Sequence, residues 1–173
     1  MFSPENLALG KRANQGRTHW YHKATKAVYG NVSQKGKYCA HTAIFPKQDV
    51  AWWQVDLGKM SEIKYIKIYY RDENTIRRFN GFRLYIGTSE NWFDEDQCYR
   101  DTEDGYPPSV VTVNCTGLAQ YITIVNSAYD EKDKQYGPIL ELFEVQVFGK
   151  STEDLKYGVL RPISAFFIDT ESV

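Results

Sequence analysis

Short segments in which apolar and polar residues alternate recur along most of this 173-residue chain. A period of two places alternate side chains on one face of a strand, so each segment predicts a strand with one buried face. Turn-forming residues separate the segments, and no window carries the apolar stripe of a long helix. We therefore expect an all-β fold, an antiparallel β-sandwich. The segments are Trp53/Val55/Leu57, Ile66/Ile68, Phe82/Leu84/Ile86, Val111/Val113, Ile122/Ile124 and Val145/Val147.

The length suits one domain with one hydrophobic core. We assign residues 1–150 to the β-sandwich and residues 151–173 to a C-terminal tail, which either packs on the domain or begins a linker. The apolar phase slips at Leu142-Phe143, which predicts a β-bulge or a strand shared between two environments. Residues 15–38 show no period and predict long loops at one end of the sandwich, where a binding site would lie.

Charge and hydropathy argue against some classes of function. The 21 lysines and arginines nearly balance 22 acidic residues, for a net charge of −1, so the chain lacks the global basic field typical of nucleic-acid binding. No segment has the roughly 20 apolar residues of a membrane span, and no secretion signal is visible. The sequons at Asn31 and Asn114 are consistent with an extracellular origin.

Three cysteines allow at most one internal disulfide. Cys98 and Cys115 flank the same polar interval, residues 101–108, and a bond between them would stabilise the fold by about 3 kcal/mol. The alternative is three reduced thiols in a cytosolic chain.

Residues 66–82 contain the main candidate site. A strand-like stretch ends at Arg71, and a short polar loop leads to Arg78, with Glu73 between them and His41 upstream. Guanidinium groups are fixed, always charged hydrogen-bond donors, and together with the His41 ring they suit the neutral, closely spaced hydroxyls of a sugar. The alternatives are a solvated strand end with two surface ion pairs, and a structural role for His41.

Three further segments resemble the F-type lectins, or fucolectins, which are jelly-roll sandwiches related to the discoidin domains of coagulation factors. They are Asn6-Leu7-Ala8-Leu9-Gly10-Lys11, Trp52-Trp53-Gln54-Val55-Asp56-Leu57 and the closing stretch from Leu140 to Gly149. The resemblance covers roughly residues 6–149 and implies an antiparallel jelly-roll of the galactose-binding-like, discoidin-like type.

The sugar-binding signature of the family is a histidine, then Arg-x-Asp, then Arg or Lys after four intervening residues. His41, Arg71, Glu73 and Arg78 match it, with a longer gap after the histidine and with glutamate in place of aspartate. By this resemblance His41, Arg71 and Arg78 would donate to an L-fucose-like sugar, and Glu73 would orient a guanidinium.

The sequence departs from the family beside this signature. Asn74 and Thr75 stand where the family has two adjacent cysteines, whose disulfide packs on the sugar. A ring of Tyr38, Trp20 or Tyr21 would have to supply stacking instead, and we select Tyr38 as the candidate. The family pattern also implies that Cys98 pairs with Cys115 and that Cys39 is buried and unpaired, because Phe143 occupies the position of its partner.

The resemblance also implies a calcium site. Asn31 and Glu144 remain as candidate ligands, whereas Tyr29 and Tyr38 replace two side chains that would carry ligand oxygens. Calcium prefers six to eight oxygen ligands. Lys35 and Lys37 lie in the same loop, and the alternative is that they partly replace the charge of the cation.

These features predict a fucose-binding, non-catalytic recognition domain that is extracellular or secreted. Its partners would be fucosylated or related glycans on glycoproteins or cell surfaces, with oligomerisation to raise avidity. The alternative is a discoidin-like adhesion or receptor module that binds protein or phospholipid. The near-neutral charge and the lack of apolar loop spikes argue against phospholipid. An enzyme is disfavoured because the three histidines are scattered and no metal or nucleophile motif is present.

Overall fold

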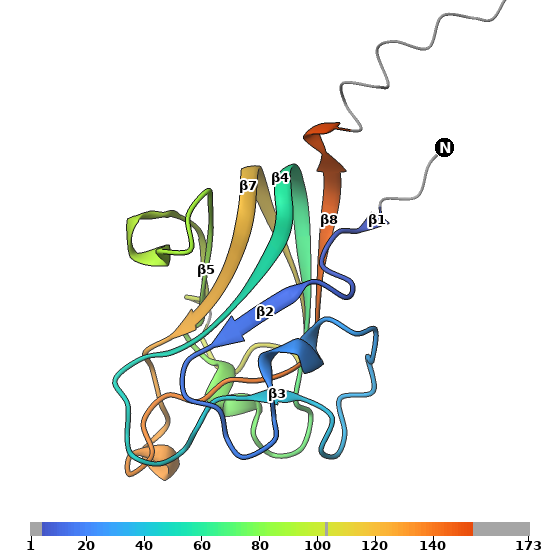
Figure 1. Cartoon of the computed structure of the whole chain (residues 1–173). Coiled ribbons are helices and arrows are strands. Elements are labelled where there is room, and N and C mark those ends of the chain that lie inside the picture. Colours follow the sequence, from blue (N-terminus) through green and yellow to red (C-terminus); the bar gives the residue numbers. More distant parts are fainter. Residues whose placement is uncertain (1–4, 103, 154–173) are drawn as a thin grey trace, which may run out of the picture.

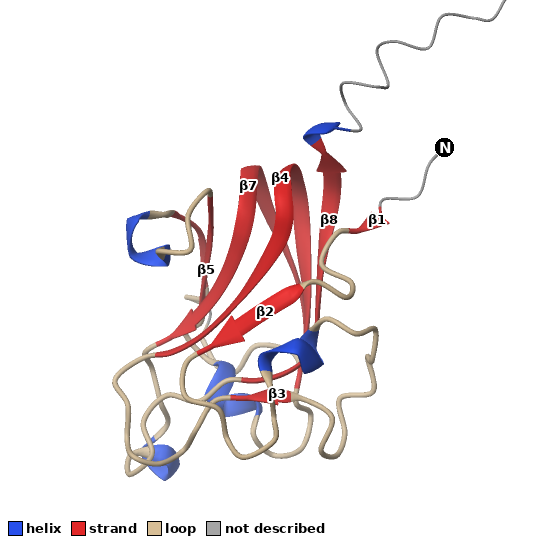
Figure 2. Ribbon diagram, viewed as in Figure 1, coloured by secondary structure: helices blue, strands red, loops and turns tan. Residues whose placement is uncertain are grey.

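A computed structural model describes residues 5–102 and 104–153 of the chain. The described part is an antiparallel β-structure with four short 3-10 turns (Figure 1, Figure 2). The strands are β1 (Glu5–Asn6), β2 (Arg12–Gln15), β3 (Ala40–His41), β4 (Ala51–Tyr70), β5 (Arg83–Gly87), β6 (Asp96–Arg100), β7 (Val110–Asn126) and β8 (Glu141–Ser151). The 3-10 turns are η1 (Ala24–Ala27), η2 (Ile76–Phe79), η3 (Trp92–Asp94) and η4 (Glu131–Asp133).

Two long strands, β4 and β7, connect the layers of the sandwich. They pair with each other along nearly their whole length and turn over together at one end of the molecule, where the register shifts between Asp56 and Ser61 (Figure 1). Before the shift β4 also pairs with β2, and after it β4 pairs with β8. The C-terminal half of β7, at residues 121–125, pairs with β5, and β5 pairs with β6. The long β4–β7 ribbon therefore supplies strands to both layers, as expected for a β-sandwich.

The core lies between the layers and consists of the residues that the alternation selects. Trp53 and Leu57 of β4 face Ile66 and Ile68 of the same strand, together with the apolar rows of the neighbouring strands, and all four are buried. The alternating positions of β5, β7 and β8 are buried as well, with Val111 partly so. The prediction of half-buried strands is confirmed because a two-residue period leaves one row of each strand facing the core.

The predicted irregularity in β8 is a β-bulge. Tyr69 lies opposite Glu144 and Tyr70 opposite Leu142, so Phe143 is the extra residue. The bulge lets Leu142 and Phe143 both be buried, and it leaves Glu144 on the opposite face from Val145. That face is not solvent-exposed: Glu144 is covered by the loop around Gly30 and is fully buried.

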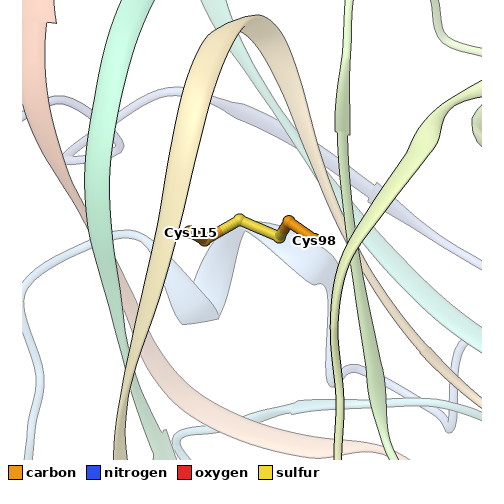
Figure 3. The surroundings of a disulfide bond; sticks show 2 residues. All are labelled: Cys98 and Cys115. Carbon is orange, nitrogen blue, oxygen red and sulfur yellow. A yellow bond between two sulfur atoms is a disulfide. The ribbon is translucent and has the colours of Figure 1, made fainter.

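Cys98 of β6 and Cys115 of β7 form a disulfide, with 5.5 Å between their Cα atoms (Figure 3). The bond ties the outer strand β6 to the central ribbon. Cys39 is free and fully buried, as the family resemblance implied, and its burial raises the pKa of its thiol to about 12. Cys39 is therefore a structural and unreactive thiol.

The end of the sandwich opposite the turn-over of β4 and β7 is formed by loops, as predicted (Figure 1). It gathers η1, β3 and the connections around residues 16–38 and 71–82. No helix in the described ranges is long and apolar enough to cross a membrane. The tail expected at residues 151–173 lies outside the described residues beyond Glu153.

Candidate functional site

A stack of three aromatic rings fixes the two arginines at the loop end. The Phe79 ring lies between the rings of Tyr70 and Phe82, with centroid distances of 4.3 and 4.0 Å, and all three rings are buried. Arg71 directly follows Tyr70, and Arg78 directly precedes Phe79. Burial of these rings therefore brings both guanidinium groups to the same place, although seven positions separate them in the chain.

The two guanidinium groups and an imidazole meet on one buried carboxylate, Glu141. Arg71 Nη1 lies 2.9 Å from Glu141 Oε1, Arg78 Nη1 lies 3.1 Å from Oε2, and His41 Nε2 lies 3.2 Å from Oε1. The Glu141 side chain is fully buried at the start of β8, opposite His41 of β3. One carboxylate therefore holds three donor side chains from three different segments.

The pKa of Glu141 shows how strongly these donors act. Burial alone would raise it, but the hydrogen bond from His41 and the charges of His41, Arg78 and Arg71 lower the pKa from 4.5 to about 2. Glu141 is therefore ionised at neutral pH, and its negative charge is matched by the surrounding cations.

Two more carboxylates complete the cluster. Glu73 Oε2 accepts from Arg71 Nε at 2.8 Å, so Glu73 orients a guanidinium as proposed from the sequence. Asp133 Oδ1 in η4 accepts from Nε and Nη2 of Arg78 at 3.1 and 2.9 Å, and its Oδ2 lies 3.0 Å from Arg77 Nη2. The alternative of isolated surface ion pairs is thus wrong: the arginines belong to a connected and largely buried network.

Among the described residues, Arg71 Nη2 and the buried Arg77 Nε are guanidinium nitrogens of this network without a hydrogen-bond partner. All three nitrogens of the Arg78 guanidinium donate to Glu141 or Asp133, and its side chain is only 16% exposed. Arg71 uses Nε and Nη1 and is 28% exposed, while its Nη2 has no partner among residues 5–102 and 104–153. A ligand at this surface therefore meets the Nη2 group of Arg71 first.

His41 lies beneath this surface. Its Nδ1 lies 2.6 Å from the carbonyl of Thr42 and its Nε2 faces Glu141, so both ring nitrogens face oxygen acceptors. The ring is 6% exposed. His41 is thus part of the cluster, and in this geometry it positions Glu141.

The three histidines are not scattered, as the sequence suggested, but lie together. The His19 ring is 4.7 Å from that of His41, and the His22 ring is 5.6 Å from it. Backbone hydrogen bonds explain this: His19 N donates to His41 O, and His41 N donates to His22 O. Burial and the neighbouring histidines lower the pKa of His19, and burial lowers that of His22.

Exposed aromatic rings border the histidines, contrary to the expectation of no apolar spikes. Trp20 is 80% exposed, and its ring stacks on His19 at 5.0 Å. Tyr38 is 62% exposed, but its contacts are with Lys26 and Tyr29 and not with the arginines. Of the residues proposed for stacking, Trp20 and Tyr21 are thus each linked to His41 through one shared ring neighbour, His19 and His22 respectively, whereas no ring contact links Tyr38 to it in the described structure.

The two residues proposed as calcium ligands make hydrogen bonds within the protein. Glu144 accepts a hydrogen bond from the backbone N–H of Gly30 at 2.9 Å, so the loop presents donors to this carboxylate. The Asn31 side chain is bound within its own loop, to Ser33 N and Tyr29. No cluster of three or more His, Cys, Asp or Glu side chains that could hold a metal occurs in the described part. Lys35 and Lys37 are exposed, and no ion pair in the described ranges joins either of them to Glu144. A backbone N–H group, that of Gly30, contacts this carboxylate instead.

Glu144 is nevertheless incompletely satisfied. Its Oε1 is buried without a hydrogen-bond partner in the described structure. Burial raises the pKa of Glu144 from 4.5 to about 7, although backbone N–H groups, with Gly30 first among them, oppose the shift. A proton and a cation would therefore compete for this carboxyl group near neutral pH.

Three solved structures share the fold of this chain. It is similar to a fucolectin from striped bass serum, with 24% identity and a TM-score of 0.73 over 87% of this chain and 50% of that one. It is similar to a Streptococcus pneumoniae fucose-binding module, with 24% identity and a TM-score of 0.69 over 87% and 100%. The lectin domain of Lectinolysin, solved with Lewis b antigen, is 28% identical, with a TM-score of 0.68 over 87% and 100%.

The chain spans half the length of the striped bass protein and the whole of the other two domains. No match was found among curated protein sequences. A model of the F5/F8 type C group, described as a NedA-like, galactose-binding domain, matches residues 26–124, which is more than half of the chain. On that match, together with the jelly-roll fold, the chain belongs to the family of NedA-like, galactose-binding domains.

Proposed function

We propose that this chain is a carbohydrate-binding domain that takes a fucose-like sugar at Arg71, with Arg78 and His41 holding the cluster beneath it. The observation that carries the proposal is the convergence of these three donors on buried Glu141, with Nη2 of Arg71 left at the surface. The Lectinolysin domain, 28% identical, was solved with Lewis B antigen and supports a glycan ligand.

The chemistry of the cluster suits recognition. Its carboxylates already accept from arginines, so they orient donors and are poorly placed to act as an acid or base. A hydrogen bond to a charged donor contributes about 1.5–3 kcal/mol, and ordering costs offset much of that. Monovalent affinity should therefore be weak, on the order of millimolar, and multivalency would raise it.

The biological setting follows from the ligand. Fucosylated glycans on glycoproteins or cell surfaces are the proposed partners, with oligomerisation as the source of avidity. The Cys98–Cys115 disulfide supports an extracellular or secreted location, because disulfides persist in oxidising compartments.

The test is a titration with L-fucose of the wild type and three variants. Arg71→Gln removes the free Nη2 donors, and Arg71→Lys keeps the charge beside Glu141 but removes the forked group. Arg100→Gln, on the exposed strand β6, is the matched control for the loss of one guanidinium.

We expect both Arg71 variants to bind L-fucose about tenfold more weakly or worse, and Arg100→Gln to bind like the wild type. Thermal unfolding of each variant shows whether the fold is intact. Unchanged binding in folded Arg71 variants would place the sugar elsewhere. A folded wild type that binds no fucosylated glycan would refute the proposal and favour the alternative of an adhesion module that binds protein.

A further inference from the structure

The charge of this chain is unevenly distributed. Residues 6–48 contain eight lysines and arginines and no aspartate or glutamate, although the whole chain has a net charge of −1. This segment forms β2, η1, β3 and the loops between them, at the end of the sandwich that holds the arginine cluster. The near-neutral total therefore hides a strongly basic face beside the proposed sugar site.

Most of these cations have no acidic partner. Arg12 pairs with Asp56 and Glu90, and Lys47 lies over the ring of Tyr129. Within the ranges that the structure describes, no ion pair includes the remaining six: Lys11, Arg17, Lys23, Lys26, Lys35 and Lys37. Their charges are therefore available to an anionic ligand.

Part of this basic face is hollowed. A pocket of about 440 Å³ is lined by Lys11, Lys26, Val28, Tyr29 and Tyr38, among others. Tyr29 and Tyr38 are 47% and 62% exposed, so their rings offer faces for stacking. Lys26 Nζ lies 6.0 Å from the Tyr38 ring, and Lys11 lines the same pocket. This combination matches a sugar ring that carries an acidic group, because the ring can stack on tyrosine while the anion meets the lysines.

A row of ring contacts leads from the arginine cluster to this pocket. The His22 ring lies 5.6 Å from that of His41 and 4.7 Å from that of Tyr21. Lys26 Nζ then lies 5.0 Å from the Tyr21 ring and 6.0 Å from the Tyr38 ring. His41 and His22 are buried, whereas Tyr21 is 50% exposed, so these contacts place the arginine cluster and the pocket in one region of the fold, which an oligosaccharide of several units would span.

We propose that the pocket at Lys11, Lys26 and Tyr38 binds a sulfated or carboxylated sugar unit of the glycan whose fucose-like unit lies at Arg71. This inference rests on the proposed function for the position of the first sugar, but the basic pocket itself does not. The domain would then select acidic fucosylated glycans over neutral ones.

The test compares three saccharides by calorimetric titration: a neutral fucosylated trisaccharide, the same trisaccharide carrying a sulfate, and the sulfated sugar without fucose. The variant Lys11→Gln/Lys26→Gln removes two charges and keeps a polar side chain with part of each apolar stem. The control Lys64→Gln/Lys150→Gln removes two charges from exposed positions on β4 and β8. Thermal unfolding confirms that each variant folds.

We expect the sulfated trisaccharide to bind about fivefold or more tightly than the neutral one, because two exposed charge contacts contribute in that range. The preference should fall with added salt and disappear in Lys11→Gln/Lys26→Gln, but persist in the control. Equal binding of the two trisaccharides, or a preference that survives loss of both lysines, would overturn the inference.

The three saccharides distinguish a failure of this inference from a failure of the proposed function. Binding of the neutral trisaccharide without a sulfate preference leaves the fucose site standing and refutes the acidic pocket. Binding of the sulfated sugar without fucose, and none of the neutral one, refutes the fucose site and supports the pocket. Vesicles of phosphatidylserine and phosphatidylcholine form a last arm: lysine-dependent binding to them, without a sulfate preference, would show a lipid-binding face and overturn the inference.

Discussion

Replacing Glu141 with glutamine should weaken both the fold and the sugar site. Glutamine keeps the shape of the side chain but removes the charge on which Arg71, Arg78 and His41 converge. A pKa lowered from 4.5 to about 2 corresponds to about 3 kcal/mol of preferential interaction with the ionised form. We expect Glu141→Gln to lose free energy of unfolding of about that size at pH 7, measured by urea denaturation.

The pH dependence provides a sharper test of the same reasoning. The folded pKa of Glu141 is depressed, so its stabilising contribution is fully present above pH 4.5 and is lost as the pH falls towards 2. The difference between wild type and Glu141→Gln should therefore shrink over this interval. Glu131→Gln, at an 84% exposed position in η4, is the matched control and should change stability by at most about 0.5 kcal/mol. A stability of Glu141→Gln within 0.5 kcal/mol of wild type at pH 7 would refute the account of the cluster.

Three further predictions follow from the described contacts. The folded pKa of Glu144 is raised to about 7, so the free energy of unfolding of the wild type should fall by up to about 3 kcal/mol as the pH rises from 4.5 to 7.5. In Glu144→Gln most of this fall should be absent, as measured by urea denaturation. Replacing Cys98 and Cys115 together with alanine should lower the free energy of unfolding by about 3 kcal/mol, and a loss below about 1 kcal/mol would contradict the role of the bond. Millimolar calcium or a chelator should leave the melting temperature and fucose binding unchanged, because Glu144 faces backbone N–H donors; calcium-dependent melting would show a site that this geometry does not contain.

Much of the fold could be predicted because the alternation of residues such as Trp53, Val55 and Leu57 reflects a direct geometric constraint of a half-buried strand. The bulge at Phe143 was visible for the same reason, since two successive buried residues break the period. The Cys98–Cys115 pair and buried Cys39 came from the family resemblance together with the position of the polar interval.

The two carboxylates that hold the arginines, Asp133 and Glu141, were not predicted from the sequence. Asp133 lies in a polar stretch that is typical of solvated charge, and Glu141 lies in a strand where only Glu144 had been singled out. Both carboxylates meet the arginines through tertiary contacts, with 55 residues separating Arg78 from Asp133 and 70 separating Arg71 from Glu141. Local sequence carries no signal for such pairs.

The histidine cluster was missed for a related reason. His19 and His41 lie far apart in the chain, and the backbone hydrogen bonds between their loops bring the rings together. The basic face escaped notice because a total charge averages over the chain, whereas a run of 43 residues without an acidic side chain could have been read directly from the sequence.

The central claim is that the buried carboxylate Glu141 presents Arg71 for a sugar. A crystal structure with L-fucose tests it most directly. The account predicts sugar density within hydrogen-bonding distance of Arg71 Nη2, with the contacts of Arg71, Arg78 and His41 to Glu141 retained. Fucose bound at another surface, or a folded crystal soaked in saturating fucose with no sugar at Arg71, would contradict it.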